Sequence, residues 1–283
     1  MTTNTVGTLY LVGTPIGNLE DITLRALRVL KECDAIACED TRQTQKLLNH
    51  FGIETRTVSY HEHNERERAT ELVSQLEQGQ SISVVTDAGM PGISDPGYRL
   101  VTLAAEHNIP VVPIPGACAF LAALVASGLP TDSFRFNGFL PSKLGQRRTA
   151  LAEIKDSQLT EIYYEAPHRI VDTLQDVVDV LGANRNVVIA REVTKLHEEF
   201  LRMKASDALA ELSKRGEVRG EITLLIGRAE QSEAPANEKK SVRQRVRELM
   251  GSEKIDEREA MKRVAKEMGV SKSEVYRELQ RGK

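Results

Sequence analysis

In VVTDAGMPGISDPG (residues 84–97), a predicted strand is followed at once by a loop too rich in Gly and Pro to form a helix or a strand. The β-branched residues at 84–86 favour a buried strand, whereas seven of the eleven residues from 87 to 97 are Gly, Pro or Asp. Irregular backbone at the end of a strand leaves main-chain N–H and C=O groups free to bind a ligand. The stretch therefore indicates a binding loop at the carboxyl end of a strand.

Strand and helix signals alternate on both sides of this stretch. Short apolar runs predict strands, and segments with apolar residues at helical spacing predict helices between them. Such alternation favours a parallel sheet covered by helices. The predicted strands are 8–12, 34–40, 57–60, 81–86 and 109–116, and the predicted helices are 22–32, 41–51, 64–78 and 97–107.

The second half of the chain has a different rhythm. Two strands follow one another near 186–203 without a helix between them, so its sheet is predicted to be mixed. Its predicted strands are 134–139, 160–165, 186–191, 197–203 and 220–227, and its predicted helices are 117–128, 145–156, 168–181 and 205–215. We expect an α/β protein with two α/β domains at 1–116 and 117–228, a polar linker at 229–240 and a small helical tail at 241–283.

Composition and charge narrow the class of protein. The 283 residues are 40% hydrophobic and 28% charged, and no apolar run reaches the length of a membrane span. Cys33, Cys38 and Cys118 are scattered thiols, so we expect a reduced, cytoplasmic protein with no disulfide or zinc framework. Residues 239–283 hold 14 Lys/Arg and 8 Asp/Glu, a net charge of +6, whereas the remaining 24 basic and 33 acidic residues give −9. A basic tail on an acidic body suggests that the tail meets a polyanion.

Three Gly/Pro loops follow three of the strands predicted in the first half: GTPIGN (13–18), the loop of 87–97 and PIPGACA (113–119). In an open parallel sheet they would converge on one pocket at the carboxyl ends of the strands. None has the Lys-Ser/Thr of a phosphate-binding P-loop or the G-x-G-x-x-G of a dinucleotide site. The loops carry Asp87 and Asp95, which suits a neutral or cationic ligand that carries an adenosine, and S-adenosylmethionine fits. The alternative, three ordinary tight turns, does not explain three such loops in register.

Seven motifs follow one another along the chain: GTPIGN (13–18), EDTR (39–42), DAGMPGISDPG (87–97), PIPGACA (113–119), YYEAPHR (163–169), REVTKLHEE (191–199) and GEITLLIG (220–227). In this order they resemble the tetrapyrrole-methylase superfamily of S-adenosylmethionine enzymes, and most closely its ribosomal RNA branch. The resemblance spans residues 7–228. It implies two α/β domains with the cofactor in the cleft between them, methylation of the ribose 2′-O of cytidine 1402 in the 16S rRNA of the small ribosomal subunit, and a homodimer.

Position by position, the resemblance also implies which residues hold the cofactor. Met90 departs from the pattern, because the ribosomal branch usually carries Thr there. The implied cofactor-binding residues are Pro15, Ile16, Ala88, Gly89, Met90, Ile93, Cys118, Ala119, Glu165, Glu221, Ile222 and Thr223.

Methyl transfer to a ribose hydroxyl is assisted by a base or by a dipole that stabilises the developing alkoxide. We expect Glu165, Arg169 and Lys195 near the acceptor as catalytic residues, and Arg42 and His61 as RNA contacts. The general base itself stays unassigned. The sequence offers His61, Glu65, Glu165, His168, Arg169, Lys195 and Glu198 as candidates.

His61-x-His63 has the spacing of a metal site. The sequence offers no obvious third ligand, however, and methyl transfer from a sulfonium has no use for zinc. We therefore expect no metal.

Residues 257–268 and 272–280 have the layout of a helix-turn-helix around Gly269. Lys272, Arg277 and Arg281 would lie on its exposed second helix, and we expect Lys272 and Arg277 to contact RNA phosphates. A packing or dimer module is the alternative for this unit. For the whole chain, the alternatives to an RNA methyltransferase are a methylase of tetrapyrrole precursors and a ligand-sensing DNA-binding regulator. The basic tail, EDTR and YYEAPHR favour RNA.

Overall fold

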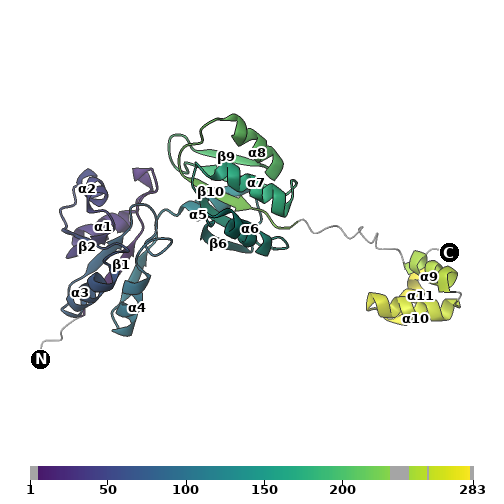
Figure 1. Cartoon of the computed structure of the whole chain (residues 1–283). Helices are drawn as coiled ribbons and strands as arrows, with labels where there is room; N and C mark the ends of the chain where they lie inside the picture. The colour runs from purple at the N-terminus through teal and green to yellow at the C-terminus, as the bar shows by residue number, and fades with distance from the viewer. Residues whose placement is uncertain (1–5, 230–241, 254, 281–283) are drawn as a thin grey trace, which may run out of the picture. The chain divides into compact units, whose positions relative to one another are not determined.

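The computed structural model describes residues 6–229, 242–253 and 255–280. The chain divides into two compact units on either side of the boundary between Ala229 and Glu230. The first unit contains two sheets with their helices, and the described part of the second contains three helices (Figure 1). Residues 230–240 of the expected linker, and Arg281, lie outside the described residues.

The first sheet is parallel throughout, in the order β3-β2-β4-β1-β5. Every residue of β2 and β4 is buried, as expected for central strands covered on both faces. The prediction of a parallel sheet is therefore confirmed. Its strands are β1 (Leu9–Val12), β2 (Ala35–Cys38), β3 (Thr57–Ser59), β4 (Ile82–Val85) and β5 (Val111–Ile114).

Helices cover both faces of this sheet. Leu72 of α3 and Leu100 of α4 belong to one hydrophobic cluster, and Leu30 of α1 and Leu48 of α2 belong to another. Helix α1 begins two residues later than predicted, because Thr23 caps it by accepting a hydrogen bond from the N–H of Ala26. The elements are η1 (Leu19–Asp21), α1 (Leu24–Glu32), α2 (Thr41–His50), α3 (Glu65–Glu77) and α4 (Tyr98–Glu106).

The second sheet is mixed, as predicted, in the order β6-β7-β10-β8-β9. Strands β6 and β7 are parallel, and the pairs β7–β10, β10–β8 and β8–β9 are antiparallel. Its strands are β6 (Phe134–Phe139), β7 (Thr160–Glu165), β8 (Asn186–Arg191), β9 (Glu199–Lys204) and β10 (Ile222–Ile226).

The two faces of the second sheet pack against different helices. Tyr163 and Ile222 belong to a cluster with residues of α6, α7 and α8, whereas Ile162 and Leu225 pack with residues of α5. Ile16, from the loop after β1, joins the cluster of α5 and so ties the first half of the unit to the second sheet. The helices are α5 (Ala119–Ser127), α6 (Leu144–Glu153), α7 (Ile170–Leu181) and α8 (Ala205–Lys214).

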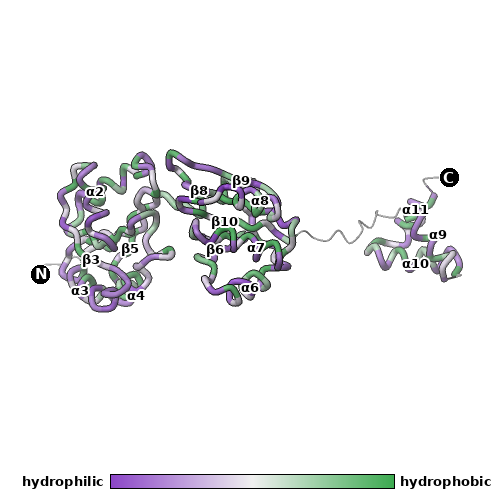
Figure 2. The backbone as a smooth tube through the Cα atoms, turned by 45° about the horizontal axis from the view of Figure 1, so that its top comes forward, coloured by the Kyte–Doolittle hydropathy of each residue, from purple (hydrophilic) through white to green (hydrophobic). Residues whose placement is uncertain are grey.

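The second unit consists of α9 (Val242–Glu253), α10 (Glu257–Met268) and α11 (Lys272–Gln280). The two predicted tail helices are confirmed as α10 and α11. Asp256 caps α10 by accepting from the N–H of Glu259, and Gly269 ends it in the left-handed conformation. Hydrophobic and hydrophilic residues alternate along most helices of both units, as amphipathic helices require (Figure 2). Helix α5 is an exception, because its sequence AFLAALVAS is apolar almost throughout. Among the described residues, no helix is both long and apolar enough to cross a membrane.

Candidate functional site

The loops after β1 and β4 are hydrogen-bonded to each other. The N–H of Thr14 donates to the carbonyl of Gly89 at 2.9 Å, and the N–H of Gly89 donates back to the carbonyl of Thr14 at 3.1 Å. The Thr14 hydroxyl also donates to the carbonyl of Thr86 at 3.0 Å. These bonds give the irregular backbone of 87–97 a fixed position at the edge of the sheet.

The loop after β5 joins the other two through a close approach of glycines. A Cβ on Gly13 would lie 2.7 Å from the Gly116 Cα and 2.7 Å from the Met90 sulfur, and a Cβ on Gly116 would lie 2.8 Å from the Gly13 Cα. No side chain fits between these backbones. Gly89 has φ +89°, a left-handed conformation that favours glycine. The three loops therefore meet at one place, as the sequence predicted.

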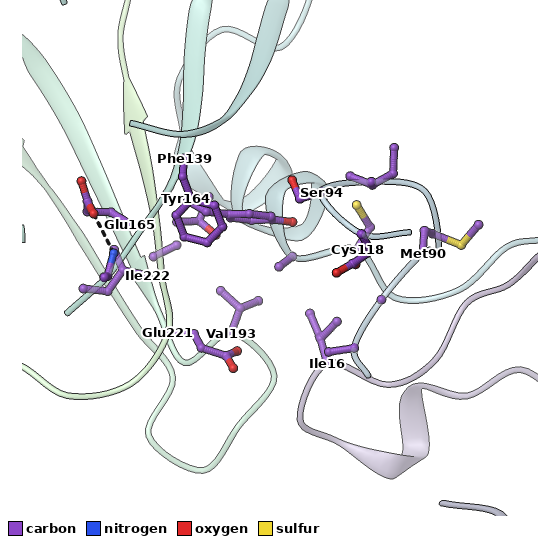
Figure 3. Close-up of a pocket in the computed structure, with 18 of the residues that line it drawn as sticks. Ile16, Met90, Ser94, Cys118, Phe139, Tyr164, Glu165, Val193, Glu221 and Ile222 are labelled. Carbon is purple, nitrogen blue, oxygen red and sulfur yellow. Dashed lines mark hydrogen bonds between the residues drawn. The ribbon is translucent and has the colours of Figure 1, made fainter. Parts of the chain in front are cut away.

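A cavity of about 330 Å³ lies between these loops and the second sheet. Figure 3 shows Ile16, Met90 and Cys118 on one side of it, and Phe139, Tyr164 and Ile222 on the other. Its described lining includes no Lys or Arg. The lining residues are Ile16, Ala88, Gly89, Met90, Ile93, Ser94, Asp95, Cys118, Ala119, Phe139, Tyr164, Glu165, Ala166, Pro167, Ala190, Val193, Glu221, Ile222 and Thr223.

Eleven of the twelve residues expected to hold the cofactor line this cavity, and Pro15 lines a neighbouring one. Sequence reasoning missed Tyr164, Phe139, Val193 and Ala190, which also line it. Side chains alternate between the two faces of a strand, so Ile162 and Tyr164 lie on the same face of β7. This alternation could have predicted that Tyr164 lines the cavity. That face packs on α5.

Glu165 turns its carboxylate away from the cavity. The residue is buried, and Tyr163 on the same face of β7 packs with α7. The carboxylate accepts from the Thr173 hydroxyl at 2.7 Å and from the N–H of Ala166 at 2.7 Å, and it pairs with the Arg169 guanidinium at 3.2 Å (Figure 3). Arg169 also donates to the carbonyl of Leu140 at 2.7 Å. Two of the three predicted catalytic side chains are thus bonded to each other in a network behind the cavity wall, with Glu165 buried and Arg169 partly buried.

Tyr164 is the principal polar side chain on the second-sheet side. Its ring lies 4.9 Å from Phe136 and 5.6 Å from Phe139, centroid to centroid. Burial raises the pKa of Tyr164 to about 12, so the phenol keeps its proton at neutral pH and can donate a hydrogen bond.

A second cavity of about 510 Å³ adjoins the first and shares Ile16, Ala88 and Glu221 with it. Lys195 lies at the junction, where its ammonium contacts Glu192 at 2.9 Å and Glu221 at 3.1 Å. Burial opposes this charge, but the two carboxylates outweigh burial and raise the pKa of Lys195. The full lining is Thr14, Pro15, Ile16, Gly17, Leu19, Gln43, Thr44, Lys46, Leu47, His50, Thr86, Asp87, Ala88, Lys195 and Glu221.

A third cavity of about 620 Å³ lies on the other side of the loop at 87–97 and shares Ser94 and Asp95 with the first. Its ionisable lining is Glu39, Glu62, Glu65, Asp95, Tyr98, Arg99 and Glu106, which is strongly acidic. Burial, with the nearby Asp87, raises the pKa of Asp95, and burial with Asp95 and Asp87 raises the pKa of Glu39.

The residues predicted to contact RNA lie in both units. Arg42 is exposed at the start of α2 and pairs with Asp40 at 2.9 Å, and this hydrogen bond lowers the pKa of Asp40 to about 2. His61 is half-buried after β3, and its Nδ1 is buried without a hydrogen-bond partner among the described residues. Lys272 and Arg277 lie on α11. RNA contact by these four residues stays a prediction.

No group of three His, Cys, Asp or Glu residues in the described part of the chain is placed to hold a metal ion. The His61 and His63 rings lie 5.9 Å apart, centroid to centroid. Cys33 and Cys38 are buried free thiols, and Cys118 is a half-buried free thiol at the cavity.

Comparison with known proteins matches this arrangement to one family. The family described as Tetrapyrrole (Corrin/Porphyrin) Methylases matches residues 8–209. The chain is 51% identical over 273 residues to a protein of Halalkalibacterium halodurans named ribosomal RNA small subunit methyltransferase I, covering 95% of this chain and 93% of that one. It is 45% identical over 271 residues to the protein of the same name from Synechocystis, covering 96% of both chains.

Solved structures show the same fold. The uroporphyrin-III-C-methyltransferase of Thermus thermophilus superposes with a TM-score of 0.56 over 79% of this chain and 95% of that one, at 18% sequence identity. At this identity the likeness concerns the fold alone.

Proposed function

Because the chain belongs to the tetrapyrrole (corrin/porphyrin) methylases and, within them, to the ribosomal RNA small subunit methyltransferase I family, we propose that it is an S-adenosylmethionine-dependent methyltransferase of 16S rRNA. The acceptor we propose is the ribose 2′-O of the cytidine at position 1402 in the small ribosomal subunit. The observation that carries the proposal is the convergence of three strand-end loops on one cavity whose described lining has no cationic side chain.

The cavity fits S-adenosylmethionine in both its chemistry and its lining. Gly89, Ala88 and Ala119 offer main-chain groups, Ile16 and Val193 offer apolar surface, and Asp95 and Glu221 place carboxylates near a positive sulfonium. When bound, this cofactor supplies a methyl group activated by the sulfonium for in-line displacement. The loops and the second sheet would hold it and exclude water from the acceptor.

Charge decides from which side the RNA approaches. In the second cavity Lys46 and Lys195 balance the carboxylates of Asp87 and Glu221. In the third cavity five carboxylates face a single arginine, Arg99. A phosphate backbone is therefore repelled more strongly by the third cavity than by the second. We propose that the acceptor strand reaches the cofactor through the second cavity.

The predicted catalytic residues receive different proposed roles. Lys195 stands at the junction of the two cavities, where it would contact the acceptor strand. Glu165 and Arg169 would act as positioning residues, because their network fixes the end of β7 that carries Tyr164. The proposed domains are 1–116 and 117–228, followed by a linker at 229–240 and a basic tail at 241–283, and the proposed location of the protein is the cytoplasm.

An exposed apolar patch supports the proposal of a homodimer. The patch consists of Leu121 and Val125 on α5 and Phe134 and Phe139 on β6, all of them exposed. The stacked rings of Phe120 and Phe136, 4.4 Å apart, join the two elements. Exposed apolar side chains on two elements that pack together are typical of a protein interface.

Three separate incubations test the function. Each contains the chain, methyl-labelled S-adenosylmethionine and one acceptor: small ribosomal subunits, naked 16S rRNA or a porphyrin precursor. We expect label in the ribose 2′-O of one cytidine. Label on a macrocycle carbon would instead assign a tetrapyrrole methylase. Cofactor binding without transfer to any of the three acceptors would favour a ligand-sensing regulator.

A further inference from the structure

The β8–β9 turn (residues 192–198) is held rigidly beside the two adjoining cavities. Val193 at its base is buried in the cluster that contains Ile16. The stem of Lys195 lies against Gly17, where an added Cβ would come within 2.3 Å of the Lys195 Cγ. The Glu192 carboxylate accepts from the N–H of Glu221 at 2.9 Å. The turn is thus fixed to both halves of the first unit.

The backbone of this turn is strained. Glu192 has φ +52° and Thr194 has φ +69°, and a β-branched residue rarely adopts the left-handed region. Two further hydrogen bonds hold the conformation: the N–H of Thr194 donates to the Glu198 carboxylate at 2.6 Å, and the N–H of Lys195 donates to the carbonyl of Glu192 at 2.9 Å. Strain of this kind persists where the surroundings over-determine it, and such sites are often functional.

The side chain that this strained turn presents is a leucine. Leu196 is 93% exposed, although it follows Lys195, whose side chain lines the second cavity. A single exposed leucine needs no explanation by itself. Leu24 is 86% exposed, for example, but it lies in the unstrained first turn of α1. Leu196 differs because a rigid and costly turn holds it outward at the edge of the site.

We propose that Leu196 is an apolar wedge that packs against a base next to the acceptor nucleotide and keeps that nucleotide out of the RNA stack. The proposal rests on the proposed function, because it assigns the turn to the same RNA substrate. A ribose in a stacked helix cannot enter a cavity, so its nucleotide must be displaced. Apolar side chains inserted between base steps achieve such displacement in other nucleic-acid complexes. Lys195 beside it supplies a cation for the neighbouring phosphate.

The test uses the full chain and an RNA hairpin that contains the acceptor cytidine with 2-aminopurine beside it, whose fluorescence rises on unstacking. We expect the wild-type chain to raise the fluorescence on binding, and Leu196→Ala and Leu196→Ser to lose most of this rise. The kcat/KM for methyl transfer should fall roughly tenfold or more, the scale expected when most of a leucine's burial is lost. Leu196→Met should restore both signals, and Leu24→Ala should change neither. Thermal unfolding should be the same for all four variants, because both leucines are exposed.

The possible results distinguish a failure of the Leu196 proposal from a failure of the proposed methyltransferase function. A wild-type chain that methylates the hairpin without unstacking the probe, or a Leu196→Ala chain that keeps the full fluorescence rise, overturns the wedge and leaves the function intact. A wild-type chain that unstacks the probe but transfers no methyl to any RNA supports the wedge and overturns the function.

Discussion

Gly13 and Gly116 are the residues on which the site most directly depends. Their backbones approach so closely that even a methyl group at either position would lie within 2.9 Å of the other residue's backbone. The printed sequence predicted that three glycine-containing loops meet, because the carboxyl ends of parallel strands share one edge of a sheet. It did not predict which glycines touch, because that depends on the twist and register of β1 and β5.

Gly13→Ala should abolish most cofactor binding, because the new methyl would push apart the loops that hold it. We expect stability to fall by about 1–3 kcal/mol, as in other overpacked sites, and the Kd for S-adenosylmethionine to rise at least tenfold by calorimetry. Gly145→Ala in α6 is the matched control, because nothing lies within 4 Å of its added Cβ. It should stabilise the protein by up to about 1 kcal/mol. Unchanged cofactor affinity in Gly13→Ala would show that the three loops do not form the binding site.

Glu165 shows what the sequence around a single residue does not decide. The motif around it suggested an acceptor-side carboxylate, but its side chain lies on the face of β7 opposite Tyr164 and bonds Thr173 and Arg169. Alternation along the strand separates Tyr164 from Glu165, but only the positions of α5 and α7 tell which face borders the cavity.

Glu165→Gln should lower the free energy of unfolding by about 3 kcal/mol, because it leaves the Arg169 charge without its buried partner. The kcat of the folded variant at saturating substrates should fall less than tenfold, and the pH profile should keep its shape. A loss of about 10³ in kcat or a new pH dependence would make Glu165 a catalytic residue. Glu217→Gln, in the exposed pair with Arg219, is the control and should leave the stability essentially unchanged, because solvent screens an exposed ion pair.

Asp95 should show an inverse dependence of stability on pH. Burial and the nearby Asp87 raise the pKa of Asp95 in the folded state. The contribution of Asp95 to folding stability is therefore fully present below its pKa in the unfolded state, about 3.9, and is lost as pH rises through the raised folded-state pKa. Asp95→Asn should therefore raise Tm at pH 7 by roughly 1–3 °C, and the gain should vanish below about pH 4.

Asp40→Asn is the control of opposite sign. Its hydrogen bond from Arg42 lowers the folded pKa to about 2, so the carboxylate stabilises the fold above the unfolded pKa and loses this effect as pH falls. Asp40→Asn should slightly lower Tm at pH 7, and the difference should shrink in acid. If Asp95→Asn instead lowered Tm at pH 7, the buried Asp95 carboxylate would not be destabilising, and this account of its raised pKa would be wrong.

At the scale of elements, most of the fold followed from the sequence. All ten described strands were predicted, and the fully buried β2 and β4 were marked by short runs that are almost entirely apolar. Two adjacent strands without a helix marked the second sheet as mixed, and β8 and β9 form that hairpin. The strained conformation of the β8–β9 turn was not predictable, because its positive-φ residues are Glu192 and Thr194 instead of Gly or Asn.

The tail helices form a separate unit, so their contribution can be removed cleanly. A chain that ends at Ala229 should bind 16S rRNA more weakly, and its log Kd should depend less steeply on log salt, because each lost phosphate contact removes about 0.7–0.9 from the slope. The double variant Lys272→Gln/Arg277→Gln should reproduce part of the change. Lys31→Gln/Arg28→Gln, on α1, is its matched control. Equal binding by the truncated and full chains at every salt concentration would show that the tail only packs.

At the scale of the whole molecule, two properties escaped sequence reasoning. The difference in charge between the two cavities that adjoin the cofactor cavity depends on which loops face each other, and no local sequence pattern shows that. The apolar patch of α5 and β6 was hidden because a buried helix and an interface helix have the same composition.

The patch predicts the state of assembly. Sedimentation should give a mass of twice the 31.4 kDa chain for the wild type, and Val125→Asp should shift it to 31.4 kDa, because a charge in an apolar interface costs several kcal/mol. Leu24→Asp, exposed outside the patch, should leave the dimer intact. A monomeric wild type at micromolar concentration would contradict the homodimer.

The central claim is that three strand-end loops and the second sheet together hold one S-adenosylmethionine. A crystal structure with the demethylated product S-adenosylhomocysteine tests it most directly. Density for that molecule should lie in the cavity between Gly89, Ala119 and Thr223, in contact with main-chain groups of all three loops. Density at any other place, with this cavity filled by solvent, would contradict the account.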